Sequence, residues 1–358
     1  MPRGYRRPDP VHRFFQSPAE SADSARLRLN RRCSIVTSEA ADPETRDKLL
    51  IGVSSCRVGE MVRFDGGHKQ SRYILDTLGR FFSFRPFCPE MAIGLGVPRE
   101  TIRLADIGSQ RRAIGNKTAD LDVTDALIES AQAQRNWHQQ IYGYIVKKDS
   151  PSCGMERVRV YHGEQPQRNG IGLYTETMMR NFPALPVEEE GRLGDPVLRE
   201  GFIKRVFIYK RWQDMLADGI DWSALTEFHA RHKLILYSHN QELGRGLDRE
   251  LAAAHDQPIE DYAPRYLNQL MQLLKISAKR SNHVNVLEHI RGYLKKELDK
   301  DDKKELSDSI EKYRLGLLPL IVPITLLRHH FRKYPNDYID RSYYMRPHPD
   351  ELMLLNSL

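Results

Sequence analysis

The chain has 358 residues, a formal net charge of +7 and 40% hydrophobic residues, which suffices for two domains with separate cores. Its 23 glycines and 20 prolines follow no period, which excludes collagen-like and low-complexity proteins. No apolar run reaches the ~20 residues of a membrane helix, and no apolar signal segment is found near residue 1. We therefore expect a cytoplasmic protein without a membrane span, whose basic excess permits an anionic partner such as nucleic acid.

Composition divides the chain into three segments. Residues 1–43 are rich in Pro, Ser and Arg and lack apolar periodicity, which predicts a disordered basic tail. Residues 44–197 alternate short apolar runs with helical patterns, which predicts an α/β domain with a parallel sheet. Residues 198–358 hold long amphipathic segments with few glycines, which predicts an all-α domain.

The elements expected in each domain follow from the period of the apolar residues. In the α/β domain we expect a strand that begins at Leu49 and runs into a loop at Cys56, and strands at 81–87 and 141–146. We also expect helices at 71–80 and 124–140 and a connecting loop at 183–196. In the second domain we expect helices at 198–216, 222–238, 240–255, 262–274, 281–296, 303–317 and 324–333.

Three of the four cysteines, Cys56, Cys88 and Cys153, come after the three predicted strands. The carboxyl ends of parallel strands meet at one edge of a sheet, where ligands bind, so we expect these thiols to converge. Three thiolates from separate loops can hold an iron–sulfur cluster and leave one iron open as a Lewis acid. A soft metal centre favours a sulfur-bearing substrate. Cys33 lies in the predicted tail and is not expected to be a ligand.

Two other interpretations of the cysteines compete with a cluster. The chain has no Cys-x-x-Cys pair, which disfavours a zinc ribbon or a ferredoxin with clustered ligands. Free cysteines are also common as small apolar core residues. Polar, turn-forming neighbours such as Ser54, Pro89 and Gly154 favour loops over a core.

The motifs around these cysteines resemble the thiouracil desulfidase family. They are Gly52-Val-Ser-Ser-Cys56, Val62-Arg-Phe-Asp-Gly-Gly-His-Lys69, Cys88-Pro-Glu90 and Ser150-Pro-Ser-Cys-Gly154. The C-terminal half resembles the helical domain fused to longer members of that family. Its matching stretches are Phe228-His-Ala-Arg-His-Lys233, His289-Ile-Arg-Gly-Tyr-Leu-Lys-Lys296 and 319–327. The resemblance covers roughly residues 48–355, and such two-domain proteins look like tRNA 4-thiouridine desulfidases.

The resemblance implies a cofactor and a reaction. Cys56, Cys88 and Cys153 would ligate a [4Fe–4S] cluster whose fourth iron takes the thiocarbonyl sulfur. Replacement of that sulfur by oxygen from water would leave uridine. Four further residues are candidates for proton transfer or substrate contact: Glu90, Ser150, Ser152 and Asp65. Each of them can instead have an ordinary structural role. Glu90 could be a carboxylate at the start of a helix, the two serines could be loop or N-cap hydroxyls, and Asp65 could form an Asx turn.

The substrate is either thiolated tRNA or a free thiouracil or thionucleoside. For tRNA, basic residues of the helical domain would track phosphates; as an alternative they form ordinary solvated helix faces. The candidates are Arg231, Lys233, Lys279, Arg280, Arg291, Lys295 and Lys296. Two functions of another kind stay open, namely a non-catalytic RNA-binding protein with structural cysteines and an enzyme that inserts sulfur. The sequence does not specify the oligomeric state.

Overall fold

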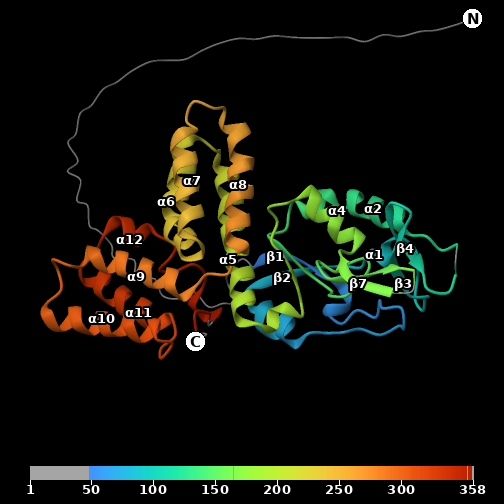
Figure 1. Cartoon of the computed structure of the whole chain (residues 1–358), viewed down its shortest axis with the longest axis horizontal. Helices are drawn as coiled ribbons and strands as arrows, with labels where there is room; N and C mark the ends of the chain where they lie inside the picture. Colours follow the sequence, from blue (N-terminus) through green and yellow to red (C-terminus); the bar gives the residue numbers. More distant parts are fainter. Residues whose placement is uncertain (1–47, 119, 164, 353, 357–358) are drawn as a thin grey trace, which may run out of the picture. The chain divides into compact units, whose positions relative to one another are not determined.

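The N-terminal half contains a four-stranded parallel sheet, sheet A, whose strands β1 and β2 are labelled in Figure 1. The computed structural model describes residues 48–118, 120–163, 165–352 and 354–356. Sheet A contains, in spatial order, β2 (Phe82–Phe87), β1 (Leu49–Ser54), β5 (Gly143–Val146) and β8 (Val187–Glu189). The parallel sheet and the helical C-terminal half confirm the predicted fold class. The expected tail at 1–43 and Cys33 lie outside the described residues.

The central strands of sheet A are buried, as parallel strands covered on both faces are. All four residues of β5 are buried, and so are residues 51–54 of β1. Gly52 lies against the ring of the buried Tyr144, because a Cβ at position 52 would be 2.5 Å from Tyr144 Cδ2. The register sets Ser54 opposite Phe87, so β1 and β2 end level with each other.

A second four-stranded sheet, sheet B, was not predicted. Its strands, in spatial order, are β4 (Gln110–Gly115), β3 (Ile102–Ile107), β6 (Val158–His162) and β7 (Gln165–Gly170). The β3–β4 and β6–β7 pairs are antiparallel, whereas β3 and β6 run parallel. Edge strand β7 has the sequence QPQRNG with five exposed residues, so it carries none of the apolar pattern by which strands are recognised.

Helices cover sheet A and build the C-terminal half. The short α1 (Pro89–Ala92) follows β2, and the predicted helix at 124–140 is broken into α2 (Thr124–Ala133) and α3 (Arg135–His138). The predicted helix at 71–80 is a π-helical turn, Tyr73–Thr77, followed by a 3-10 turn, Leu78–Arg80. Helix α4 (Leu173–Asn181) was not predicted; it packs beside α2 (Figure 1).

All seven helices predicted for the C-terminal half are present. They are α5 (Pro196–Asp218), α6 (Trp222–His239), α7 (Gln241–Ala253), α8 (Ile259–Lys275), α9 (Arg280–Tyr293), α10 (Lys300–Arg314) and α11 (Ile321–Lys333). A short α12 (Asp337–Arg341) was not predicted. Within the described ranges, none of the helices combines the length and the apolar character needed to cross a bilayer.

Helix α5 begins with a standard N-cap and packs on sheet A. The Asp195 carboxylate accepts hydrogen bonds from the backbone N–H groups of Val197 and Leu198, at 2.8 and 3.0 Å. Phe202 and Val206 of α5 share a buried cluster with Ile51 of β1.

The predicted connecting loop at 183–196 instead contains edge strand β8. An acidic loop is expected to be exposed to solvent, yet Glu188 and Glu189 are buried. Glu188 is compensated by Arg192 at 2.6 Å and by Arg205 at 3.6 Å, and buried carboxylates need such partners.

Several histidines are buried in the neutral form. Burial, with Arg85 nearby, lowers the pKa of His138 to about 4, and its Nε2 lies 2.8 Å from the Tyr174 hydroxyl. Burial, with Lys204 nearby, lowers the pKa of His239 to about 3. The pKa values of His232 and His283 also lie well below the usual range because both side chains are buried.

These histidines should make the free energy of unfolding fall at acid pH. A histidine in the unfolded chain titrates near pH 6.5. Above that pH the histidine is neutral in both the folded and the unfolded chain, so the free energy of unfolding has its full value. As pH falls below 6.5, the unfolded chain gains protons that the native state excludes until the folded pKa is reached. We expect each buried histidine to cost about 1 kcal/mol at pH 5.5, measured as the free energy of unfolding in urea at pH 7.5 and 5.5.

A pair of variants checks the origin of this effect. His138→Gln should reduce the loss between pH 7.5 and 5.5, because it removes one titrating group, whereas His289→Gln at an exposed position should leave it unchanged. An identical loss in His138→Gln and the unmutated protein would contradict the assignment.

Candidate functional site

Loops that follow three parallel strands enclose one cavity at the carboxyl edge of sheet A. The cavity has a volume of about 270 Å³ and is lined by Cys56, Cys88 and Cys153. Cys56 lies in a 3-10 turn directly after β1, Cys88 caps α1 directly after β2, and Cys153 lies in the loop after β5. Thiols that are 32 or more residues apart in the sequence therefore share one space. We call it the thiol cavity.

Two glycines hold the Cys153 loop against the start of α4. A Cβ at Gly172 would lie 2.5 Å from the Ser152 carbonyl carbon, and a Cβ at Gly154 would lie 2.9 Å from the Ser150 carbonyl oxygen. Only glycine permits such close backbone approach. The Thr175 hydroxyl of α4 donates to the Cys153 carbonyl oxygen at 2.7 Å. The position of the Cys153 thiol is therefore set by α4 as well as by β5.

The three thiols are protonated in the absence of a metal. Burial raises the pKa of Cys56, opposed by the charge of Arg57, and burial raises the pKa of Cys88. Burial raises the pKa of Cys153 furthest, and the neighbouring thiol of Cys88 acts in the same direction. Since thiolate is the form that binds metal, metal binding here would release protons.

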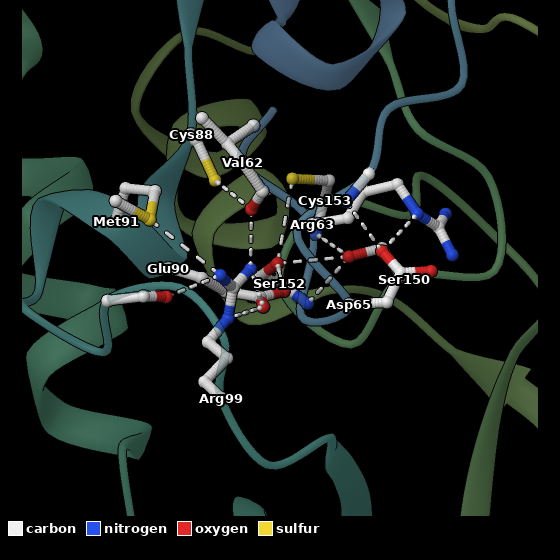
Figure 2. Close-up of polar contacts among 12 residues, drawn as sticks. Val62, Arg63, Asp65, Cys88, Glu90, Met91, Arg99, Ser150, Ser152 and Cys153 are labelled. Carbon is white, nitrogen blue, oxygen red and sulfur yellow. Dashed lines mark hydrogen bonds and ion pairs between the residues drawn. The ribbon is translucent and has the colours of Figure 1, made fainter. Parts of the chain in front are cut away.

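Glu90 lies at the centre of a hydrogen-bonded chain beside the thiols (Figure 2). Its Oε2 accepts from Arg99 Nε at 2.9 Å and Nη2 at 2.7 Å. Its Oε1 accepts from the Ser152 hydroxyl at 2.7 Å, and that hydroxyl lies 3.0 Å from the Ser150 hydroxyl. Figure 2 shows the sulfur atoms of Cys88 and Cys153 on one side of this chain. The carboxylate is thus fixed in orientation where it lines the thiol cavity.

The two candidate serines have different positions. Ser150 lines the cavity, and its Oγ accepts from the backbone N–H of Cys153 at 3.1 Å. Ser152 is fully buried behind the cavity wall and links Glu90 to Ser150. Its Oγ also lies 3.6 Å from Cys153 Sγ. Ser150 therefore faces the cavity, and Ser152 connects it to the Glu90 carboxylate.

Asp65 does not line the thiol cavity. Its Oδ1 accepts from the Gly67 backbone N–H at 3.1 Å and from Arg63 Nε at 3.3 Å. These bonds, that of Gly67 first, lower the pKa of Asp65. The structure thus shows the Asx turn, and this turn places Arg63 and Phe64 in the cavity wall.

Arg99 is a site residue that sequence reasoning missed. Besides Glu90, its guanidinium donates to the Val62 carbonyl oxygen at 2.9 Å and to that of Gly96 at 2.8 Å. It thereby joins the loop after β1 to the turn after α1. A lone arginine nine residues after Glu90 carries no pattern in the sequence that would indicate this role.

The basic residues predicted to contact RNA do not gather in one cavity. Arg231, Lys233 and Arg280 line three separate cavities. Lys233 pairs with Asp248 at 2.8 Å, and Arg291 pairs with Glu288 at 2.6 Å. The remaining three, Lys279, Lys295 and Lys296, are exposed.

The donor set of the thiol cavity is chemically suited to a thiolate-bound cluster. Three cysteine side chains, the ligands of iron–sulfur clusters, line one space. The charged groups around them are paired: Arg57 and Lys147 lie 3.7 and 3.5 Å from Glu190, and Arg99 lies 2.7 Å from Glu90. In the described ranges, no group of three His, Cys, Asp or Glu side chains is placed to hold a single metal ion.

The fold and the site define a class of protein, a domain with three convergent cysteines joined to a helical domain. Residues 51–190 match the family described as 2-thiouracil desulfurase. Residues 233–349 match a family described as a protein of unknown function, DUF1722. The chain belongs to the thiouracil desulfidase family, in a two-domain form.

The chain is also similar to two individual proteins over part of its length. The chain is 30% identical to the solved structure of TudS, described as a [4Fe-4S]-dependent thiouracil desulfidase, covering 42% of this chain and 95% of that one, with a TM-score of 0.33. It is 29% identical over 154 residues to the uncharacterized protein YbgA of Escherichia coli K12, covering 43% of this chain and 91% of YbgA.

Removal of any one of the three thiols should prevent cluster loading. We expect Cys56→Ala, Cys88→Ala and Cys153→Ala to bind little iron and sulfide after anaerobic reconstitution, because each removes one of three ligands. The measurement is iron and sulfide content together with absorbance near roughly 400 nm, typical of thiolate-bound clusters. Cys33→Ala is the matched control and should load like the unmutated protein. Full loading of any of the first three variants would remove that cysteine from the ligand set.

Proposed function

We propose that this chain is a desulfidase that replaces the thiocarbonyl sulfur of a thiolated uracil by oxygen. The balanced reaction is hydrolytic: R₂C=S and water give R₂C=O and hydrogen sulfide. The observation that carries the proposal is the shared cavity of Cys56, Cys88 and Cys153, with the oriented carboxylate of Glu90 in its wall. The family membership and the [4Fe-4S] dependence of TudS support it.

A [4Fe–4S] cluster would be held by Cys56, Cys88 and Cys153. When bound, it would supply a soft Lewis-acid position for the sulfur atom, at an iron without a protein ligand. The protein's own groups have to orient the base, exclude bulk water and move protons.

Glu90 is placed to take a proton from the attacking water. A carboxylate oxygen has two lone pairs, so Oε1 can accept from water while it accepts from Ser152. Arg99 holds Oε2 with two hydrogen bonds, which keeps Oε1 aimed at the serines. The Ser152–Ser150 pair then offers a route by which the proton reaches the cavity surface, since the two hydroxyls are 3.0 Å apart. Proton transfer of this kind contributes typically 10²–10⁴-fold to a rate.

Glu90→Gln should therefore separate cofactor binding from turnover. Glutamine keeps the size and one acceptor oxygen but cannot take the proton, so we expect normal iron content and a kcat lower by about 10²-fold or more. The measurement is sulfide release by the reconstituted protein. Glu60→Gln, at an exposed position outside the cavity lining, is the matched control. A fully active Glu90→Gln protein would remove Glu90 from the mechanism.

We infer that the preferred substrate is thiolated tRNA, docked through a basic cavity of the helical half. This cavity, of about 800 Å³, is lined by five arginines: Arg231, Arg328, Arg332, Arg341 and Arg346. Arg328 is paired with Asp350 at 2.9 Å and Arg341 with Glu227 at 3.4 Å. Among the described residues, the other three have no carboxylate partner. Unpaired arginines beside a tyrosine, here Tyr343, suit the phosphates and bases of RNA.

A free thiouracil or thionucleoside is the second candidate substrate. The thiol cavity has a volume of about 270 Å³, just below the roughly 300–1,000 Å³ of small-molecule pockets. A bound cluster would occupy part of this space, so the volume does not select between a free base and a base extruded from a tRNA stack. We propose the cytoplasm as the location of this enzyme, because reducing conditions there keep such thiols free.

Removal of two unpaired arginines separates these substrates. We expect the double variant Arg332→Ala, Arg346→Ala to raise the KM for thiolated tRNA about tenfold, because phosphate contacts supply much of RNA affinity. Turnover of free 2-thiouracil should not change. Loss of 4-thiouridine and gain of uridine, measured by nucleoside chromatography, report the reaction and its direction.

The control for this experiment removes equal charge elsewhere. Lys303→Ala with Lys304→Ala alters exposed residues of α10 and should leave both substrates unaffected. If the arginine variant is unimpaired on tRNA, the docking surface is wrong. If tRNA is not desulfurated at all while thiouracil is, the second candidate is the substrate. A gain of thiouridine would overturn the proposed direction, and absence of any conversion would favour an RNA-binding protein with structural cysteines.

A further inference from the structure

A second polar cavity lies at the side of α5 and shares no residue with the thiol cavity. Its volume is about 550 Å³, well within the roughly 300–1,000 Å³ of small-molecule sites. Its walls come from β8 and the turn after it, from the first half of α5, and from residues 274–280, which connect α8 to α9. We call it the α5 cavity. The proposed desulfidase reaction assigns it no role.

The α5 cavity has an excess of positive charge. Five arginine and lysine side chains line it against three glutamates, Glu156, Glu188 and Glu200. Each glutamate is already paired: Glu188 and Glu156 with Arg192, and Glu200 with Lys204 at 3.2 Å. No carboxylate in the described part of the chain pairs with Lys275 or Arg280. The lining therefore leaves two positive charges uncompensated.

Two buried atoms of the lining lack hydrogen-bond partners. Arg205 is 7% exposed, and its Nε–H group is a donor without an acceptor among the described residues. His239 is 3% exposed, and its Nδ1 donates to the Ile276 carbonyl oxygen at 2.6 Å. The Nε2 atom of this neutral ring is therefore an acceptor, and it has no donor in the described residues. A buried polar atom without a partner costs about 1–3 kcal/mol. Neither atom is exposed to the cavity, so a ligand supplies their partners only after the two side chains turn toward it.

The same cavity has an apolar side. Leu198, Leu274 and Ile276 line it together with two methionines. A bare inorganic anion would leave these side chains uncovered and would not use the acceptor of His239. The lining thus fits an organic ligand that carries an anionic group, a hydroxyl or N–H donor, and an apolar body.

We propose that the α5 cavity binds a phosphate monoester of a hydroxylated organic molecule, of about the size of a nucleoside monophosphate. A phosphate monoester carries about −1.5 to −2 charge at pH 7, which matches the two uncompensated cations, Lys275 and Arg280. Its oxygens accept from Lys275 and Arg280 and, once the buried side chains turn toward the cavity, from Arg205 Nε. A hydroxyl of the same molecule then donates to His239 Nε2. An internal phosphate of RNA has one charge and no free end, and it does not suit groups as deeply buried as Arg205 and His239.

Calorimetric titration of the full chain tests this proposal. The probes are uridine 5′-monophosphate and glucose 6-phosphate, compared with uridine and with inorganic phosphate. We expect at least one ester to bind at least tenfold more tightly than inorganic phosphate, and uridine not to bind. Binding of neither ester, or binding of uridine as tight as that of its monophosphate, would overturn the proposal.

Variants assign the binding to this cavity. Arg280→Ala and Lys275→Ala should each weaken ester binding at least tenfold, and Ala278→Trp should abolish it by filling the space without removing a charge. Lys279→Ala, an exposed neighbour outside the lining, is the matched control and should bind normally. If Lys148→Ala in the thiol cavity removes ester binding while Arg280→Ala does not, the ester binds at the desulfidase site and the proposal is wrong. Because binding is measured without turnover, the result is independent of the proposed desulfidase activity.

Discussion

Parallel pairing of β1 with β2 and β5 is the constraint on which the rest of this site depends. The hydrogen-bonded register makes β1 and β2 end level with each other, at Ser54 and Phe87. All three strands therefore leave the sheet at the same edge, and the loops that follow them converge there. Cys56 and Cys88 need only one or two further residues to reach the cavity. Cys153 is seven residues beyond β5, and it depends in addition on the glycine contacts with α4.

Burial and paired charges set the electrostatics of the thiol cavity. Burial raises the pKa values of the three thiols, so they are neutral, which is the form that a low-dielectric site favours. The cations near Cys56 and Cys88 are balanced by carboxylates: Arg57 and Lys147 by Glu190, and Arg99 by Glu90. Arg99 has two functions here, since it neutralises Glu90 and also fixes the direction of that carboxylate. An orienting arginine of this kind makes a single carboxylate suitable for proton transfer at a defined position.

Three cavities with different chemistry divide the work that we propose for this chain. The small thiol cavity suits a single base, the arginine-lined cavity suits an RNA backbone, and the α5 cavity suits a small phosphate ester. One short segment of the chain contributes to the walls of both the thiol cavity and the α5 cavity. Glu189 of β8 accepts from the Met155 N–H at 3.0 Å, and Met155 lines the α5 cavity two residues after Cys153. Residues on either side of this short segment thus face different ligands.

Local pattern in the amino-acid sequence was enough to specify much of this protein. Short apolar runs predicted β1, β2 and β5, and amphipathic periods predicted all seven long helices of the C-terminal half. The position of each cysteine after a strand, together with the family motifs, predicted their convergence. Features that depend on partners distant in the chain were fixed by tertiary packing instead. Strands β7 and β8 were missed because their sequences are polar and acidic. Strands β3 and β6 do alternate apolar and polar residues, but their pairing joins residues distant in the chain, Leu104 with Val160. Arg99 was missed for the same reason, since its role arises from contacts with Val62 and Glu90 that no local spacing encodes.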